Sequence, residues 1–382
     1  MASSVSGSAA ILQREPMSFP MKTLDPFLFA VFHDDKYPAG SSSSMAAPIR
    51  GDGSDFELST KKPFRMYHGE TIPGFPQHPH RGLETITVTL EGLVDHADSL
   101  GAGGRYGQGD CQHMCAGSGI QHQEMFPLIK QQAPNTLKLY QLWLNLPAKA
   151  KLCPPDMLMH WAENVQRVGG ENGGFALCYV GELAGAKGGA TPASSWASDP
   201  EHHVGVYFIS LPPGGSFTLP PVPNVKPGVT VNRMAYVTIG AVDGVVAPHT
   251  TLTLDSTQPF PVRNSGTEAA EVLILQGVPI GEPVVSHGPF VVSSSAVRLC
   301  LFCPSDLSSD LFPKPHTLTR QMNTRAEIAQ AFADFQRTGF GGWPWPEEEV
   351  VFPREQGRFV QRSIGGKIVR ELPPSGERAP EL

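Results

Sequence analysis

Two pairs of side chains that can bind a metal ion, one at each end of residues 74–125, constrain the fold of this chain more than any other feature. His78 and His80 form the first pair, and His122 and Glu124 form the second. Residues two positions apart on a β-strand point to the same face of a sheet, so each pair can converge on one point. Three neutral imidazoles and one carboxylate suit a divalent first-row metal such as iron, manganese, nickel, copper or zinc. The stretch therefore predicts two strands that assemble one metal site.

The residues around these pairs are typical of short strands separated by turns. The segment that follows the first pair alternates threonine with apolar residues and ends at Glu91-Gly92, which is typical of a turn. If no bulge intervenes, we expect Ile86, Val88 and Leu90 to share the face of the first histidine pair, with the threonines pointing outward. Glycine (40) and proline (37) are abundant and only 17% of residues are charged, a balance that favours strands over long helices.

The rest of the chain predicts a second β-domain followed by one helix. The length of 382 residues is enough for two domains, and further short strand-like segments run from about residue 175 to about residue 276. Thr324 and Glu327 form a capping box, an apolar stripe at helical spacing follows, and Gly339 stands where the helix would end. We expect this helix to pack against a barrel.

Charge and cysteine content exclude several classes of protein. The net charge of −7 and the pI of about 6.0 give no electrostatic case for direct nucleic-acid binding. No apolar run reaches the roughly 18 residues of a membrane helix. The six cysteines are scattered, which is typical of reduced thiols in a cytoplasmic or nuclear protein. Cys300 and Cys303 form a lone CxxC without a second pair, which favours free thiols over a metal or redox site.

Several long segments resemble the pirin family of the cupin superfamily. They include HPHRGLETITVTLEGLVDHADSLG (78–101), GDCQHMCAGSGIQHQEM (109–125) and MNTRAEIAQAFADFQRTGFG (322–341). The resemblance extends from about residue 16 to about residue 346. It implies an all-β protein made of two cupin barrels, of the double-stranded β-helix or jelly-roll type, with a C-terminal helix.

The resemblance also assigns the metal site. It implies that the N-terminal barrel binds one divalent metal, first of all Fe(II), through His78, His80, His122 and Glu124. Manganese, nickel, copper and zinc remain alternatives. The C-terminal barrel would bind none, in agreement with the absence of any HxH or HxE pair from residues 172–290.

Four further polar residues have a weaker case. Glu84 is interpreted as a residue that lines the barrel or lies behind the ligands, because pirins take their carboxylate ligand from the second motif. His113 stands where the family usually has tryptophan, and a surface or core histidine is favoured over a role beside the ligands. His96 has aspartates on both sides, so we expect one of them to hydrogen-bond it. Arg81 either orients a ligand carboxylate or a partner, or forms a salt bridge.

The expected organisation has six parts. Residues 292–321, which precede the helix, are absent from the family pattern, and we interpret them as a translated intron or a disordered insert. The parts are a disordered tail (1–15), a metal-binding cupin domain (16–150), a cupin domain without metal (170–291), the insert (292–321), the helix with the end of the pirin region (322–346), and a tail (347–382).

The resemblance implies two classes of function. Some pirins are flavonol dioxygenases of the quercetin 2,4-dioxygenase type, in which the metal would hold the substrate as a Lewis acid while Glu124 served as ligand and base. Other pirins are iron-dependent, redox-sensing modules that bind transcription regulators. We expect a monomer in the cytoplasm or nucleus, without direct contact to nucleic acid or a membrane.

Overall fold

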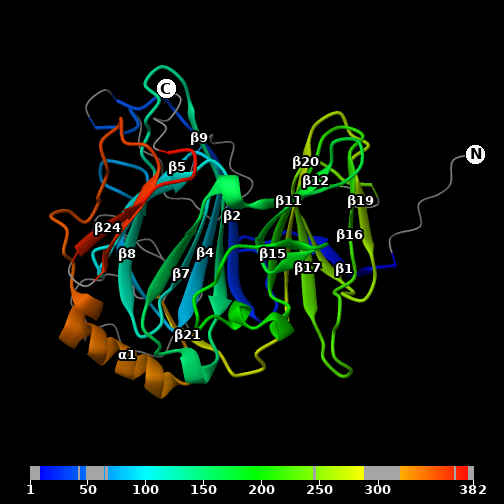
Figure 1. Ribbon diagram of the computed structural model, residues 1–382. Helices are drawn as coiled ribbons and strands as arrows, with labels where there is room; N and C mark the ends of the chain where they lie inside the picture. Colours follow the sequence, from blue (N-terminus) through cyan, green and yellow to red (C-terminus); the bar gives the residue numbers. More distant parts are fainter. Residues whose placement is uncertain are drawn as a thin grey trace, which may run out of the picture.

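Two β-barrels lie side by side in the computed structural model (Figure 1). The structure describes residues 9–41, 44–48, 64, 68–243, 247–287, 319–364 and 367–376. Strands dominate these residues, and α1 (Arg325–Thr338) is the one α-helix among them. The all-β class with two barrels and a C-terminal helix is thereby confirmed. Five 3₁₀ turns complete the elements: η1 (Ala148–Ala150), η2 (Ala162–Asn164), η3 (Trp196–Ser198), η4 (Pro200–His202) and η5 (Gly339–Gly341).

The N-terminal barrel is built from two sheets. In the five-stranded sheet the strand order is β10-β7-β4-β9-β2, and every neighbouring pair is antiparallel. In the eight-stranded sheet the order is β21-β22-β3-β8-β5-β6-β23-β24, with one parallel pair between β22 and β3. The strands of the first sheet are β2 (Phe27–Tyr37), β4 (Leu83–Glu91), β7 (Cys111–Cys115), β9 (Asn135–Asn145) and β10 (Asp156–His160). Those of the second are β3 (Gly74–Arg81), β5 (Leu93–Asp98), β6 (Gly103–Gly107), β8 (Ile120–Met125), β21 (Val285–His287), β22 (Thr319–Met322), β23 (Phe359–Ile364) and β24 (Lys367–Glu371).

The C-terminal barrel has a seven-stranded antiparallel sheet of order β1-β18-β17-β20-β15-β12-β11 and two strand pairs, β13-β14 and β16-β19. Its apolar core includes alternate residues of β15, β17 and β20. The strands of the large sheet are β1 (Ile11–Pro16), β11 (Gln166–Gly169), β12 (Phe175–Val180), β15 (Gly205–Leu211), β17 (Asn232–Ile239), β18 (Thr250–Leu254) and β20 (Ala270–Gly277). The pairs are β13 (Glu182–Leu183), β14 (Ala186–Lys187), β16 (Ser216–Leu219) and β19 (Phe260–Arg263).

A corner at Gly82 decides which residues face the metal-binding pairs. The chain leaves β3 and enters β4 in the other sheet through Gly82, whose φ is +75°. Ile86 and Val88 therefore pack in the core between the two barrels, with Leu90 against it. The expectation that these residues share the face of the histidines is wrong, because the alternation of faces does not continue through a corner. The threonines of β4 are buried instead, and Thr87 donates a hydrogen bond to Glu124 (3.2 Å).

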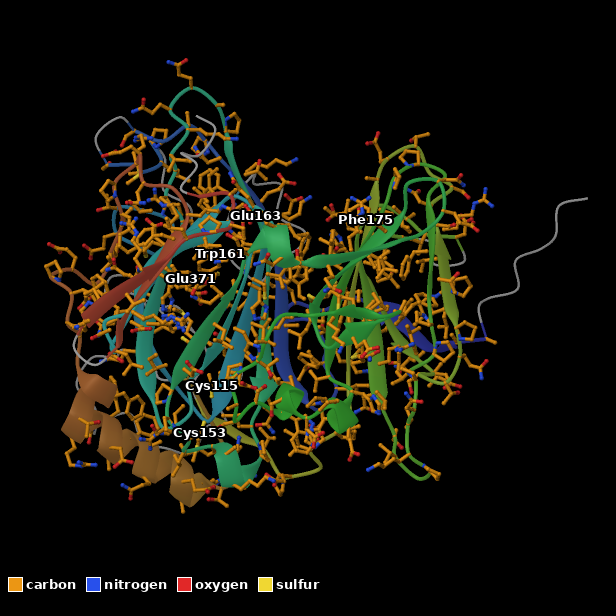
Figure 2. All side chains as sticks on the ribbon, viewed as in Figure 1. Cys115, Cys153, Trp161, Glu163, Phe175 and Glu371 are labelled. Atoms are coloured by element: carbon orange, nitrogen blue, oxygen red, sulfur yellow. The ribbon has the colours of Figure 1, made fainter. Side chains whose placement is uncertain are left out.

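The two ends of the chain are exchanged between the barrels. β1 pairs with β18 of the C-terminal barrel, so the expected tail of residues 1–15 is ordered from Ile11 onward. The expected tail of residues 347–382 contains β23 and β24, which extend the eight-stranded sheet of the N-terminal barrel through β6. The Trp161 indole donates to Glu371 at the end of β24 (2.8 Å; Figure 2). Both tails are therefore parts of a sheet over these segments.

Helix α1 begins and ends as the sequence predicts. The Thr324 hydroxyl accepts a hydrogen bond from the Glu327 amide (3.2 Å), and Gly339, with φ +55°, ends the helix. The Arg81 guanidinium donates to Asp334 (2.9 Å), which ties the helix to β3. No helix among the described residues is long and apolar enough to cross a membrane. Of the insert at 292–321, residues 292–318 lie outside the described residues, and its last three residues belong to β22.

Candidate metal centre

Three histidines converge on one point inside the N-terminal barrel. β3 and β8 pair antiparallel with His78 directly opposite His122, and His80 follows two positions later on β3. The potential ligand atoms of the three side chains all lie within 4.8 Å of one another. Their ring centroids are 4.4–4.9 Å apart, and the residues are 6%, 2% and 0% exposed for His78, His80 and His122. Among the described residues, this is the one group of three or more potential ligands with such spacing.

The hydrogen bonding of these histidines fits a metal site. Nδ1 of His78 donates to the carbonyl of Pro76 (2.8 Å), which leaves Nε2 as the nitrogen with a free lone pair. Both ring nitrogens of His80 and of His122 are buried without a hydrogen-bond partner within the described chain. Buried polar atoms without partners are rare in proteins, and a divalent metal would satisfy one lone pair on each ring.

Burial keeps the three rings neutral. Desolvation lowers the pKa of His78 to about 4, partly opposed by the hydrogen bond to Pro76. Desolvation also lowers the pKa of His80 and of His122 well below the usual range, and the neighbouring histidines add to this effect. A neutral imidazole is the form that binds a metal, so the site is ready for a cation at neutral pH.

Glu124 lies in the same barrel interior, but its carboxylate is held by other side chains. It accepts hydrogen bonds from Gln141 (3.1 Å), Thr87 (3.2 Å) and Tyr106 (3.5 Å). Desolvation raises the pKa of this carboxyl, although His96 and the three donors oppose the shift. Glu124 does not belong to the group of ligand atoms within 4.8 Å. Its role as the fourth ligand therefore stays a prediction.

Both barrels match models of a known family. The pirin model matches residues 15–144, and the model of the pirin C-terminal cupin domain matches residues 206–297. A pirin-like protein of Caulobacter vibrioides is 34% identical over 274 residues, which cover 70% of this chain and 81% of that protein. The chain belongs to the pirin family.

Other similar proteins align with more than half of the chain. Human pirin is 28% identical over 306 residues, which cover 78% of this chain and 90% of that protein. A Pseudomonas aeruginosa protein that bears the provisional name quercetin 2,3-dioxygenase is 34% identical over 222 residues, 58% of this chain and 73% of that protein. The crystal structure of a quercetin 2,3-dioxygenase from Acinetobacter baumannii has a TM-score of 0.59 at 23% identity and covers 87% of this chain and 98% of that one. That likeness shows the shared cupin fold, so the expected pair of cupin domains is confirmed.

Sequence reasoning missed the three donors to Glu124 in this pirin-family barrel. They come from β4, β6 and β9, which are distant in sequence and meet only in the closed barrel. The alternating threonines of β4 were a signal for Thr87, but the corner at Gly82 reverses the face that they were expected to take. His96 behaves as expected, since its Nε2 lies 3.3 Å from Asp98.

Arg81, Glu84 and His113 lie outside the histidine group. Arg81 forms the salt bridge with Asp334, so the simpler of its two interpretations is confirmed. The interpretation of Glu84 as a residue that lines the metal-binding barrel is wrong. Its side chain lies on the face of β4 that is turned toward the C-terminal barrel, where Ser195 donates a hydrogen bond to its carboxylate (2.7 Å). His113 is a fully buried core histidine, 3.3 Å from the Glu84 carboxylate, as the favoured interpretation had it.

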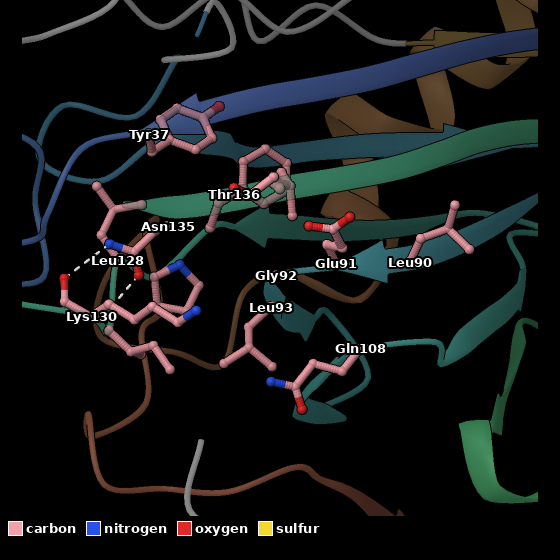
Figure 3. Close-up of a pocket in the computed structure, with 14 residues that line it drawn as sticks. Tyr37, Leu90, Glu91, Gly92, Leu93, Gln108, Leu128, Lys130, Asn135 and Thr136 are labelled. Atoms are coloured by element: carbon pink, nitrogen blue, oxygen red, sulfur yellow. Dashed lines mark hydrogen bonds between the residues drawn. The ribbon is translucent and has the colours of Figure 1, made fainter. Parts of the chain in front are cut away.

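A pocket of about 290 Å³ opens at one end of the N-terminal barrel (Figure 3). Its lining combines the end of β2 at Tyr37, the turn between β4 and β5, and the loop that follows β8. The Asn135 carboxamide bonds both the amide and the carbonyl of Lys130, which holds that loop in place (2.8 and 3.0 Å; Figure 3). Phe126, which also lines the pocket, belongs to the barrel core. None of the three histidines lines this pocket.

Proposed function

We propose that this pirin-family chain is a metal-dependent dioxygenase that cleaves flavonols of the quercetin type. The observation that carries the proposal is the group of three buried, neutral histidines with a carboxylate of raised pKa two residues from one of them. His78, His80, His122 and Glu124 would hold a divalent metal, with Fe(II) first and Mn, Ni, Cu or Zn as alternatives. The metal supplies Lewis-acid and redox chemistry when bound. The provisional name of the Pseudomonas aeruginosa relative supports the reaction class.

Glu124 is the residue that we assign to proton transfer. Desolvation raises the pKa of its carboxyl, which makes the carboxylate a stronger base than an exposed one. Gln141 donates to one oxygen, and Thr87 and Tyr106 donate to the other, so the group is held in one orientation. In the proposed reaction this carboxylate accepts the proton of the substrate's 3-hydroxyl group.

The test combines metal analysis with O₂ consumption. Purified protein loaded in turn with Fe, Mn, Ni and Cu is offered a panel of flavonols, and ring cleavage and O₂ uptake are followed together. Glu124→Gln keeps the shape of the side chain and should retain part of the metal while losing about 10²–10⁴-fold in rate. The matched control is Glu91→Gln, which makes the same substitution at the exposed end of a different strand of this barrel, β4. If no metal form of the wild-type protein cleaves any flavonol, the dioxygenase proposal fails.

A second candidate is a metal-dependent, redox-sensing module that binds a protein such as a transcription regulator. The observation that favours it is the burial of the three histidines, none of them more than 6% exposed. The pocket of about 290 Å³ in the N-terminal barrel and a second pocket of about 770 Å³, lined by residues between Gly181 and Pro279, contain none of these three histidines in their lining. Protein binding that differs between Fe(II) and Fe(III) forms, without flavonol turnover, would support this function over the first.

A further inference from the structure

Two cysteines lie in contact at the lower end of the N-terminal barrel (Figure 2). Cys115 is the last residue of β7 and is buried, whereas Cys153 follows η1 and is partly exposed. Both thiols are free, and their Sγ atoms are 3.5 Å apart. A disulfide has an S–S distance of about 2.05 Å, so a small rotation of the side chains would bring the sulfurs to bonding distance.

Backbone contacts hold the two thiols together. The Ser118 amide donates to the carbonyl of Cys153 (2.8 Å), and the Cys153 amide donates to that of Ala150 (3.0 Å). Gly117 has φ +46°, and a Cβ atom there would lie 2.2 Å from the Cys153 carbonyl oxygen. The turn after β7 must therefore carry glycine at this position to let the two segments approach, which keeps the sulfurs close.

The surroundings give the two thiols different roles. Burial raises the pKa of the Cys115 thiol far above its usual range, and the Glu84 carboxylate and the second thiol add to this. Because its pKa is raised, Cys115 remains a protonated thiol at neutral pH. Because it is only 1% exposed, an oxidant in solution cannot reach it. Cys153 is the member of the pair with access to solvent, so an oxidant would react there first.

We propose that Cys115 and Cys153 are a reversible oxidation site, which hydrogen peroxide converts into a disulfide. The Cys153 thiolate attacks one peroxide oxygen, the O–O bond breaks, hydroxide leaves, and Cys153 becomes a sulfenic acid. The hydroxide released in this step takes the proton of the Cys115 thiol and becomes water, and the Cys115 thiolate then attacks the Cys153 sulfur and displaces a second hydroxide. Two electrons pass from the thiols to the peroxide, and a thiol reductant reverses the change.

The disulfide would close a loop that contains β8 and β9. β8 carries His122 and Glu124, and β9 carries Gln141, so the link would fasten the part of the chain that supplies half of the candidate site. Closing a loop of this length restricts the unfolded chain more than the folded one. The oxidised protein should therefore unfold at a higher temperature than the reduced protein, by several degrees.

The test is a titration of the full-length protein with hydrogen peroxide, followed by alkylation, digestion and mass spectrometry. The expected product is a linked Cys115–Cys153 peptide that has lost two hydrogen atoms and that dithiothreitol separates. Cys111 and Cys178, which are buried, are the internal controls and should remain open to alkylation after unfolding. Cys300 and Cys303 lie outside the described residues, so the titration is repeated in the Cys300→Ser/Cys303→Ser background.

Two variants separate the steps. Cys115→Ser should accumulate sulfenic acid on Cys153, which dimedone labels, and Cys153→Ser should abolish both the link and the rise in Tm. A linked peptide together with a Tm rise confined to protein that contains both cysteines supports the proposal. The proposal is overturned if peroxide leaves both thiols alkylatable, or if it oxidises Cys153 to sulfinic acid without forming the link.

Discussion

Replacing Arg105 with methionine should detach the C-terminal segment from the N-terminal barrel. Arg105 on β6 is 0% exposed, and its guanidinium donates to both oxygens of Asp95 (2.6 and 2.7 Å). The same group donates to the carbonyls of Phe352, Pro353 and Gln356, each at 2.8 Å. One buried cation thus joins β5 and β6 to the segment that leads into β23.

The expected loss of unfolding free energy follows from these contacts. Removing one partner of a buried ion pair typically costs about 3–5 kcal/mol, because the other charge is left without compensation. Burial already raises the pKa of Asp95 and Arg105 lowers it, so without Arg105 the carboxyl takes up a proton at higher pH. That protonation limits the loss, and we expect about 3 kcal/mol near neutral pH.

Urea unfolding and limited proteolysis measure the two effects separately. Arg105→Met should lower the unfolding free energy by the stated amount and open residues 343–376 to cleavage. Arg105→Met/Asp95→Asn should recover part of the loss, since no charge then remains buried at this place. The matched control is Arg337→Met, which breaks the ion pair between Arg337 and Asp334 (3.1 Å). The Arg337 side chain is 72% exposed, so this substitution should lower the unfolding free energy by less than about 1 kcal/mol.

Two results would refute this reasoning. The first is a loss below about 1 kcal/mol in Arg105→Met, which would mean that the buried pair contributes no more than an exposed one. The second is a normal loss of stability with an unchanged cleavage pattern. That result would mean that the carbonyls of the C-terminal segment are held by other contacts.

Three further outcomes can be checked. The wild-type protein should hold one metal ion per chain by elemental analysis, and two ions per chain would contradict this. His122→Ala should remove the metal and leave the far-UV circular dichroism unchanged, because the barrel core is apolar. Burial lowers the pKa of His160 from 6.5 to about 4, so the unfolded chain takes up this proton at higher pH than the folded chain. His160 therefore stabilises the fold fully above pH 6.5, and about 3 kcal/mol is lost as the pH falls to about 4; urea titrations at several pH values should show a shallower dependence in His160→Gln. Thr324→Ala removes the N-cap of α1 and should cost about 1 kcal/mol in thermal unfolding, whereas Thr324→Ser should cost much less.

The strands and the shared face of His78 and His80 could be predicted because both depend on local spacing, whereas the meeting of His122 with this pair was implied by the resemblance to the pirin family. A period of two places His78 and His80 on one face whatever their strand pairs with, and the Thr324 cap depends on three neighbouring residues. The faces of β4 could not be predicted, because they depend on the corner at Gly82 and on which sheet receives the strand. The partners of Glu124 were equally hidden, since Gln141 and Tyr106 reach it only when the barrel closes.

The exchange of the two chain ends has a consequence for synthesis on the ribosome. β1 leaves the ribosome long before its pairing partner β18, which belongs to the second barrel. β6 in turn waits for β23, which is made long after it. β1 therefore has no partner until β18 appears, and the edge of β6 has none until β23 is made; an unpaired edge is open to pairing with another chain. Protection of these edges against aggregation is therefore completed only when β23 has been made.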